Sequence, residues 1–261
     1  MLDIIVICVN RPLELFYWTM HSSHLLRVLP SLKRLVIVNS DHIQVFSNTS
    51  LENSRNHSNI ISPIKYFFRR RLTRELPFSK SFYLRLGYLY SISDYIFFLD
   101  SDIRILPHDI NHLFGYLRNS IFSAVYLDKV YEASDPHRNA IHFGYMPVIT
   151  PLSSPLTRIT IEPWTSIGCR PGFGNLLVKR TAYLDAGLHD LNYDSYGWED
   201  HDLITSLQLN DHLVARSGHA FHCTSENHIN SSSIQTRSDS LERMRQLYLL
   251  KYSPYINANP S

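Results

Sequence analysis

Three short apolar segments, separated by stretches with helical spacing, constrain the fold of this 261-residue chain most strongly. The segments are Ile4–Val9, Leu35–Val38 and Tyr95–Leu99. Strands that are apolar at every position are typical of parallel sheets covered by helices on both faces. Apolar residues recur at helical spacing over 13–29 and 80–93, which completes a β-α-β alternation. The pattern predicts an α/β fold with a Rossmann-like, mostly parallel sheet whose ligands bind beyond the carboxyl ends of its strands.

The second half of the chain has a less regular pattern. The segment 151–171 is rich in Pro, Ser and Thr, which predicts an extended loop around Trp164. We expect a single continuous domain with a first lobe over 1–115, a second lobe over 116–235, and a terminal helix and tail over 236–261. In the second half, strands are expected over 121–126, 141–149, 176–178 and 213–215, and helices over 181–186, 199–207 and 238–252.

Composition and charge exclude several classes of protein. Hydrophobic residues make up 44% of the chain and charged residues 18%, so a large core can form. The formal net charge of +2 is too small to indicate a nucleic-acid partner. The first apolar run is short and lacks a basic region before it, and no run of roughly 18 apolar residues follows. We therefore expect neither a signal peptide nor a transmembrane segment.

Cysteine usage and one basic cluster bear on location. Cys8, Cys169 and Cys223 lack CxxC spacing, which favours a reducing compartment and a cytoplasmic protein. The cluster of Arg69–Arg71 with Arg74 fits a solvated face, and a contact with an anionic membrane or an acceptor is the sharper alternative. Peripheral attachment at the cytoplasmic membrane face therefore stays open. Nothing in the sequence indicates the oligomeric state.

Two carboxylates follow the third apolar segment directly, in the order Asp100-Ser101-Asp102. Side chains alternate between the faces of an extended chain, so Asp100 and Asp102 point the same way and Ser101 points the other way. Carboxylates at the end of a buried strand must be solvated, paired or metal-bound, because a bare buried charge is costly. A hard divalent cation is a natural partner, and it also binds a diphosphate. The triplet therefore predicts a metal–diphosphate site.

Three ordered motifs resemble one class of enzymes. Residues 95–102 resemble the DxD segment of glycosyltransferases with the GT-A fold. Residues 172–180 (Gly-Phe-Gly-Asn-Leu-Leu-Val-Lys-Arg), the pair Gly187-Leu188 and residues 196–203 (Tyr-Gly-Trp-Glu-Asp-His-Asp-Leu) resemble the carboxyl-terminal half of β-1,4-galactosyltransferases. They are also similar to chondroitin-polymerase and polypeptide GalNAc-transferase domains. The resemblance implies a GT-A fold with a smaller sheet on the acceptor side.

This resemblance implies transfer of a sugar from a nucleotide sugar, expected to be a UDP-sugar, to a hydroxyl of a glycan, glycolipid or protein acceptor. The first lobe would bind the nucleotide sugar and the second lobe the acceptor. Asp200 would act as the general base of an inverting reaction, while Glu199 would bind sugar hydroxyls and Trp198 would offer an apolar face to a sugar ring. The turn at Gly174 would let the backbone approach the sugar closely. Because polypeptide GalNAc-transferases retain configuration, retention also stays open.

The resemblance also implies a bound Mn²⁺ or Mg²⁺. Asp102 would ligate the metal, and Asp100 would touch the metal or the ribose. Mn²⁺ accepts mixed carboxylate and imidazole ligands, and the segment Gly218-His-Ala-Phe-His222 supplies two histidines. The galactosyltransferase pattern implies both His219 and His222, whereas the GalNAc-transferase pattern favours His219.

The nucleotide contacts implied by the resemblance lie in several segments. The sequence departs from the family pattern at Leu86, where Asn is expected, and lacks Asp-Gly-Ser after the second strand. These departures bear on the base contacts and hence on UDP specificity. Besides Asp100, Ser101 and Asp102, the implied contacts are Val9, Asn10 and Arg11 after the first strand, Asn39 and Asp41 after the second, and Lys80 and Arg85 in the following helix.

Two other functions are compatible with parts of the pattern. Haloacid-dehalogenase-like phosphatases also carry Asp-x-Asp at the end of an apolar strand and hold Mg²⁺. Their nucleophile strand usually opens the domain, whereas two β-α units precede Asp100 here. A non-catalytic sugar-binding protein with the transferase fold is the second alternative. The presence of Asp100, Asp102 and Asp200 together favours an enzyme.

Overall fold

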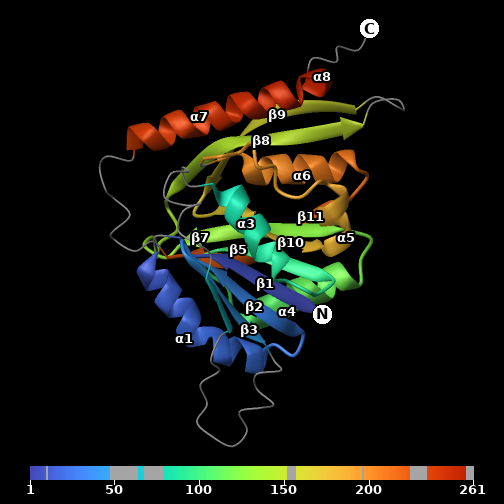
Figure 1. Cartoon of the computed structure of the whole chain (residues 1–261). Coiled ribbons are helices and arrows are strands. Elements are labelled where there is room, and N and C mark those ends of the chain that lie inside the picture. Colours follow the sequence, from blue (N-terminus) through green and yellow to red (C-terminus); the bar gives the residue numbers. More distant parts are fainter. Residues whose placement is uncertain are drawn as a thin grey trace, which may run out of the picture.

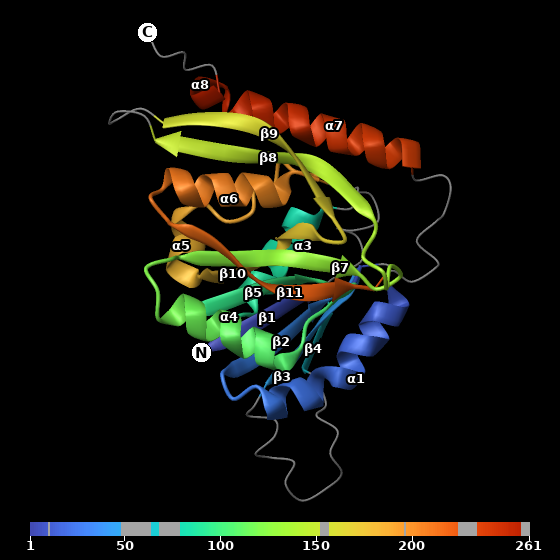
Figure 2. The same ribbon diagram turned by 180° about the vertical axis from the view of Figure 1, so that it is seen from behind.

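The computed structural model describes residues 1–9, 11–47, 64–67, 79–151, 157–195, 197–223 and 234–256. One nine-stranded sheet forms the centre, and a separate two-stranded sheet lies to one side. Figures 1 and 2 show helices α1 (Pro12–Val28) and α4 (Pro107–Arg118) on one face of the large sheet. Helices α3 (Lys80–Leu89), α5 (Arg180–Asp185) and α6 (Glu199–Leu209) cover the other face.

The large sheet has the order β4-β3-β2-β1-β5-β10-β7-β11-β6. Parallel pairing joins β1 to β2, β1 to β5 and β7 to β11, and the remaining neighbours are antiparallel. Six of these nine strands consequently run in one direction, with β3, β6 and β10 opposed. The strands are β1 Leu2–Ile7, β2 Leu32–Val38, β3 His42–Ser47, β4 Ile64–Phe67, β5 Tyr95–Asp100, β6 Ile103–Arg104, β7 Ala124–Glu132, β10 Arg170–Lys179 and β11 Val214–His222.

The three apolar segments of the sequence form the centre of this sheet. Most residues of β1, β2 and β5 are buried, as expected for strands with a helix layer on each side. Their side chains divide between two hydrophobic clusters, one beneath α1 and α4 and the other beneath α3, α5 and α6. The prediction of an α/β fold, with a mostly parallel sheet flanked by helices and a smaller second sheet, is confirmed.

The smaller sheet corrects one sequence-based prediction. β9 (Thr157–Ile167) pairs antiparallel with β8 (Ile141–Pro151), with Gly144 opposite Trp164, so most of the segment expected to be an extended loop is a strand. Four of the five residues over 157–161 are β-branched, which is typical of a strand. Pro163 suggested a loop, but in a two-stranded sheet each strand has one unpaired edge that tolerates proline.

The hairpin of β8 and β9 supports the last helical layer. Figures 1 and 2 show the hairpin over α6, with α7 (Ile234–Lys251) lying on the hairpin and the short α8 (Ser253–Ile256) at its end. A third hydrophobic cluster fills this space, with Ile159 from β9 packed near Met244, Tyr248 and Tyr252. The C-terminal helix therefore packs on the body, as its apolar spacing predicted. No helix within the described residues is long and apolar enough to cross a membrane.

Candidate active site

A cavity of about 590 Å³ lies beyond the carboxyl ends of β1 and β5, between the large sheet and the β8–β9 hairpin. This is the edge of the sheet where α/β folds bind their ligands. Further walls come from β7, β10, β11 and the start of α6. Of the site residues expected from the sequence, the cavity is lined by Val9, Arg11, Lys80, Asp100, Ser101, Asp102, Gly174, Trp198, Glu199, Asp200 and His222.

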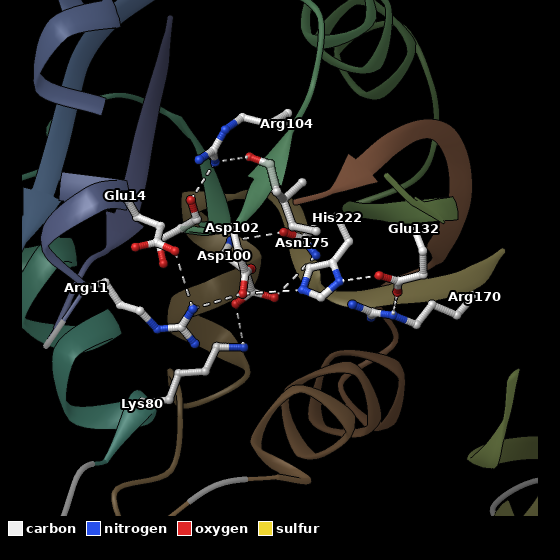
Figure 3. Close-up of polar contacts among 12 residues, drawn as sticks. Arg11, Glu14, Lys80, Asp100, Asp102, Arg104, Glu132, Arg170, Asn175 and His222 are labelled. Atoms are coloured by element: carbon white, nitrogen blue, oxygen red, sulfur yellow. Dashed lines mark hydrogen bonds and ion pairs between the residues drawn. The ribbon is translucent and has the colours of Figure 1, made fainter. Parts of the chain in front are cut away.

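Asp100 and Asp102 both line the cavity, on either side of Ser101. Asp100 is the last residue of β5, and its backbone N–H donates to Asn175 Oδ1 at 2.9 Å. Ser101 is 6% exposed, and its carbonyl accepts hydrogen bonds from Trp18 Nε1 and Arg104 Nη1. These contacts fix the turn after β5. Figure 3 shows the two carboxylates close together among basic side chains.

Asp102 belongs to a chain of charged contacts that crosses the cavity wall (Figure 3). Its Oδ2 atom lies 3.2 Å from Arg11 Nη1 and 3.4 Å from His222 Nε2. On the far side of the imidazole, His222 Nδ1 lies 2.6 Å from Glu132 Oε2, and Glu132 Oε1 contacts Arg170 Nε at 3.3 Å. Burial favours the neutral carboxyl of Asp102, but the hydrogen bond and charge of His222 and the charge of Arg11 outweigh it and lower its pKa.

Lys80 contacts three carboxylates at the centre of the cavity. It is the first residue of α3, and its Nζ atom lies 3.0 Å from Asp100 Oδ1, 3.4 Å from Glu199 Oε1 and 3.0 Å from Asp200 Oδ2. Burial alone would lower the pKa of Lys80, but the three carboxylates raise it well above its usual value. Lys80 therefore stays protonated and joins the end of β5 to the start of α6.

Gly174 lies among these charged groups, where a side chain would not fit. A Cβ atom at this position would lie 2.7 Å from Asp200 Oδ2, 2.7 Å from Lys80 Nζ and 3.0 Å from Asp100 Oδ2. The bare backbone of β10 thus leaves room for the charged cluster.

The second acidic pair begins helix α6. Trp198 precedes the helix with a left-handed φ of 65°, and Glu199 and Asp200 form its first turn, where the helix dipole favours negative charge. Glu199 is 2% exposed, and its Oε2 atom is buried without a hydrogen-bond partner. Burial, opposed by Lys80 and assisted by Glu199 and Asp100, raises the pKa of Asp200 to about 7. A carboxyl with this pKa can take up and release a proton near neutral pH.

His219 and His222 lie on opposite faces of β11, because residues three apart in a strand point to opposite sides. His222 lines the cavity, whereas His219 has a side chain 47% exposed and lies 3.8 Å from Asp109 on α4. The structure therefore does not bring the two histidines together. Only His222 stands beside Asp102.

Several residues expected to bind the nucleotide lie outside the cavity lining. Arg85 donates to the backbone carbonyls of His189 and Gly187, so it fastens α3 to the loop after α5. Asn39 and Asp41 lie in the turn after β2, where the Asn39 N–H donates to the His42 carbonyl. Asn10 lies outside the described residues, as do Tyr196 and the arginines of the basic cluster at 69–74.

Sequence reasoning missed Glu132, Arg170 and the aromatic residues that the hairpin contributes. Glu132 ends β7, and Arg170 begins β10 opposite Val130. Their pairing depends on register between strands far apart in the sequence, which no local pattern reveals. The hairpin residues Phe143, Tyr145 and Trp164 were missed because the pairing of β8 with β9 was not expected.

The residues present fit one divalent cation. Asp102 and His222 present an oxygen and a nitrogen donor 3.4 Å apart, and the contact of Glu132 with Nδ1 orients the imidazole. The cavity lining carries five carboxylates and three Lys or Arg side chains, so it can accept positive charge. Among the described residues, no group of three or more His, Cys, Asp or Glu could hold a metal. The remaining ligands of an ion would have to come from a substrate and water.

No protein-family description and no curated protein matches the sequence. Among solved structures, the chain is similar to glucosyl-3-phosphoglycerate synthase from Mycobacterium tuberculosis, whose crystal structure contains phosphoglyceric acid. The TM-score is 0.44, with 14% identity, covering 93% of this chain and 79% of that chain. The function proposed below therefore rests on the geometry of the cavity.

Proposed function

We propose that this protein is a metal-dependent glycosyltransferase that moves a sugar from a UDP-sugar to an acceptor hydroxyl. The observation that carries the proposal is the meeting of two acidic centres in one cavity. Asp100 and Asp102 come from the end of β5, and Glu199 and Asp200 come from the start of α6. Lys80 contacts one member of the first pair and both members of the second. A leaving diphosphate and an attacking hydroxyl need such a pair of neighbouring centres.

The diphosphate belongs at the end of β5. Asp102 and His222 would hold Mn²⁺ or Mg²⁺, which would neutralise charge that builds on the departing diphosphate. Arg11 contacts Asp102 at 3.2 Å and can turn toward a phosphate oxygen, since its side chain is 33% exposed. The position of Arg11 after β1 supports its predicted role at the nucleotide end.

The acceptor hydroxyl belongs beside Asp200. In the inverting reaction, the hydroxyl oxygen bonds to the anomeric carbon as the bond from that carbon to the diphosphate breaks. Asp200 takes the hydroxyl proton, and its pKa of about 7 suits a general base at neutral pH. Lys80 keeps Asp200 oriented through contacts of 3.0 and 3.3 Å with its two oxygens. The proton thus leaves to Asp200, and the diphosphate leaves beside the neighbouring end of β5.

The decisive experiment incubates the protein with UDP-sugars, an acceptor panel and Mn²⁺, and measures UDP release and product configuration. We expect UDP release that EDTA abolishes and Mn²⁺ restores, with a product of inverted configuration. Full activity in EDTA would remove the metal from the proposal, and a retained configuration would remove Asp200 as base of a single displacement. Phosphate release from simple phosphomonoesters without sugar transfer would favour the phosphatase alternative.

The metal assignment has a test that does not depend on turnover. We expect His222→Ala to weaken Mn²⁺ binding in the presence of UDP by roughly tenfold or more, as measured by calorimetry. His219→Ala is the matched control, because it removes the same side chain from the opposite face of the same strand. Equal effects of the two substitutions would contradict the assignment of His222.

A further inference from the structure

The imidazole of His222 has a carboxylate on each side of its ring. Nδ1 lies 2.6 Å from Glu132 Oε2, and Nε2 lies 3.4 Å from Asp102 Oδ2. The contact with Glu132 has the length of a strong hydrogen bond to an ionised group, whereas the contact with Asp102 is longer than a normal N–H···O bond. A neutral imidazole carries one N–H, so only one of the two carboxylates can accept it.

The position of this proton decides whether the ring can bind a metal. A metal ion binds the lone pair of a neutral imidazole nitrogen, so the nitrogen beside Asp102 must be the one without the proton. An Nε2–H directed at Asp102 would fill the space between the two ligands. Because a carboxylate oxygen only accepts, the 2.6 Å contact with Glu132 places the proton on Nδ1 and leaves the Nε2 lone pair facing Asp102.

Strand register brings Glu132 to the imidazole. Glu132 is the last residue of β7 and His222 the last residue of β11, and the two are direct partners in the parallel pairing of these strands. The side chain of His222 is 16% exposed and that of Glu132 is 19% exposed. Water therefore competes little with their hydrogen bond.

Arg170 orients the carboxylate of Glu132. Its Nε atom lies 3.3 Å from Glu132 Oε1, which leaves Oε2 for the imidazole. Arg170 is paired with Val130, two residues before Glu132, and the register shifts between Arg170 and Gly172. Gly172 permits this close approach of β10 to β7, because a Cβ atom there would lie 2.7 Å from Val130 Cγ2. The glycine that begins the motif over 172–180 therefore supports the place of Arg170.

We propose that Glu132 is a positioning residue for the metal site, which accepts the N–H of His222 at Nδ1, keeps Nε2 open toward Asp102 and depends on Arg170 for its own orientation. This inference rests on the proposed function, because it concerns the metal of that function. It assigns roles to two residues outside the sequence motifs. Metal affinity then depends on β7 and β10 as well as on the two ligands.

NMR of the full chain without metal measures the position of the proton directly. Long-range ¹H–¹⁵N spectra distinguish the two neutral tautomers, and the His222 signals are those that His222→Ala removes. At a pH above which these signals no longer change, we expect Nδ1–H in the parent protein. In Glu132→Ala the proton should move to Nε2, where Asp102 is the remaining carboxylate. Nε2–H in the parent protein, or an unchanged tautomer in Glu132→Ala, would overturn the inference.

Calorimetry with Mn²⁺ in the presence of UDP measures the consequence for metal affinity. Loss of a partner that orients a ligand typically weakens metal binding by about ten- to a hundredfold, and we expect this of Glu132→Ala. Glu132→Gln keeps an oxygen that can accept from Nδ1–H, so it should weaken binding less. Arg170→Leu should also weaken binding by less than Glu132→Ala does, since it leaves the Glu132 carboxylate present.

Asp128→Asn is the matched control. Asp128 also lies on β7, and its carboxylate contacts Arg216 Nε of β11 at 3.5 Å, so the substitution removes an ion pair between the same two strands. The control should bind Mn²⁺ as the parent protein does. Equal Mn²⁺ affinities in Glu132→Ala and Asp128→Asn would overturn the inference. Thermal midpoints show that the variants are folded, and the conservative Glu132→Gln decides the comparison if Glu132→Ala is not.

The inference and the proposed function fail differently. If Mn²⁺ affinity depends on Glu132 while UDP-sugars release no UDP with any acceptor, the proposed transfer is wrong and the positioning role stands. If UDP release requires metal while Glu132→Ala binds Mn²⁺ as the parent protein does, the transfer stands and the positioning role is wrong. A parent protein that binds no Mn²⁺ would overturn the inference together with the metal of the proposed function.

Discussion

At the residue scale, Asp200 has an environment that balances opposite electrostatic effects. Burial and the neighbouring Glu199 and Asp100 carboxylates raise its pKa, while the Lys80 ammonium group lowers it. The result of about 7 is far from the usual value of a carboxyl group, as is common for groups that transfer protons. Its position in the cavity beside Gly174 gives a substrate room to approach.

The pH dependence of turnover follows from this balance. Because the base must be ionised, we expect kcat/KM to rise with pH and to level off above about pH 7. Asp200→Asn should lower kcat by about a hundred- to ten-thousand-fold with UDP affinity nearly kept. Lys80→Gln removes the charge that lowers the pKa of Asp200, so the acidic limb of the profile should move to higher pH. Stopped assays of UDP release measure the pH profile of kcat/KM. A flat profile between pH 5 and pH 8 would contradict the assignment of Asp200 as the base.

A substitution at Gly174 tests whether the charged groups around it need the space that a side chain would fill. We expect Gly174→Ala to lower kcat/KM strongly, because the new methyl group displaces the Lys80 and Asp200 side chains. The atoms it meets are the ends of side chains, so the thermal midpoint should change little. Gly115→Ala is the matched control, since nothing lies within 4 Å of its added Cβ in the interior of α4. That control should gain about 0.5–1 kcal/mol in stability and keep full activity, and equal activity losses in both variants would refute the steric argument.

The individual site residues were predictable to different degrees. Asp100 and Asp102 could be identified because a buried strand runs directly into them, and Glu199 and Asp200 because they begin a helix after Gly197-Trp198. The roles assigned to them stay predictions until activity is measured. The contact of Glu132 with His222 was not predictable, because the pairing of β7 with β11 sets it across 90 residues.

At the element scale, α7 holds the first half of α6 in place. Tyr248 of α7 is fully buried, its ring lies 5.0 Å from that of Trp198, and its hydroxyl lies 2.6 Å from Thr205 Oγ1. Tyr252 and Lys251 contact Asp202 Oδ1 at 2.9 and 2.7 Å. Helix α7 thus contacts Trp198, which precedes α6, and Asp202 and Thr205 within α6.

We expect Tyr248→Ala to destabilise the protein by about 3–5 kcal/mol, as other large-to-small changes of buried aromatics do. Tyr248→Phe keeps the ring but leaves the Thr205 hydroxyl without this partner, so a smaller loss of about 1–3 kcal/mol is expected. Tyr255→Ala on α8, where the side chain is 38% exposed, serves as the control and should change stability by less than about 0.5 kcal/mol. Urea unfolding measures all three. A Tyr248→Ala protein as stable as the control would show that α7 does not support α6.

Element prediction succeeded where periodicity and burial agreed. The central strands and the helix over 12–28 have clear apolar patterns, and a proline begins that helix. β9 was not predicted because Pro163 and the Ser and Thr content favoured a loop. β11 is longer than expected because Ser217, Gly218 and His219 interrupt its apolar pattern. β3 and β6 were not expected at all, since pairing with β2 and β11 rather than local pattern defines them.

At the scale of the whole molecule, the large sheet joins the two lobes that the sequence suggested. β10 of the second lobe is hydrogen-bonded to β5 of the first over Leu176–Lys179, and β6 of the first lobe pairs with β11 of the second. The cavity between them is lined from both sides of the boundary at residue 115. A ligand that fills it therefore stabilises contacts between both halves of the chain.

Thermal unfolding tests this coupling and the nucleotide site together. Because the sheet crosses the lobe boundary, we expect one cooperative transition by circular dichroism and by tryptophan fluorescence, whereas independent lobes would give two.

UDP with Mn²⁺ at a hundred times its dissociation constant should raise the free energy of unfolding by about 2.7 kcal/mol. At about 2–4 °C per kcal/mol for a chain of this size, the midpoint should rise by roughly 5–10 °C. Asp102→Asn should lose most of that shift, since it removes the carboxylate that His222 and Arg11 contact. If the shift persists in Asp102→Asn and in EDTA, the nucleotide binds without the metal, and the end of β5 is not its diphosphate site.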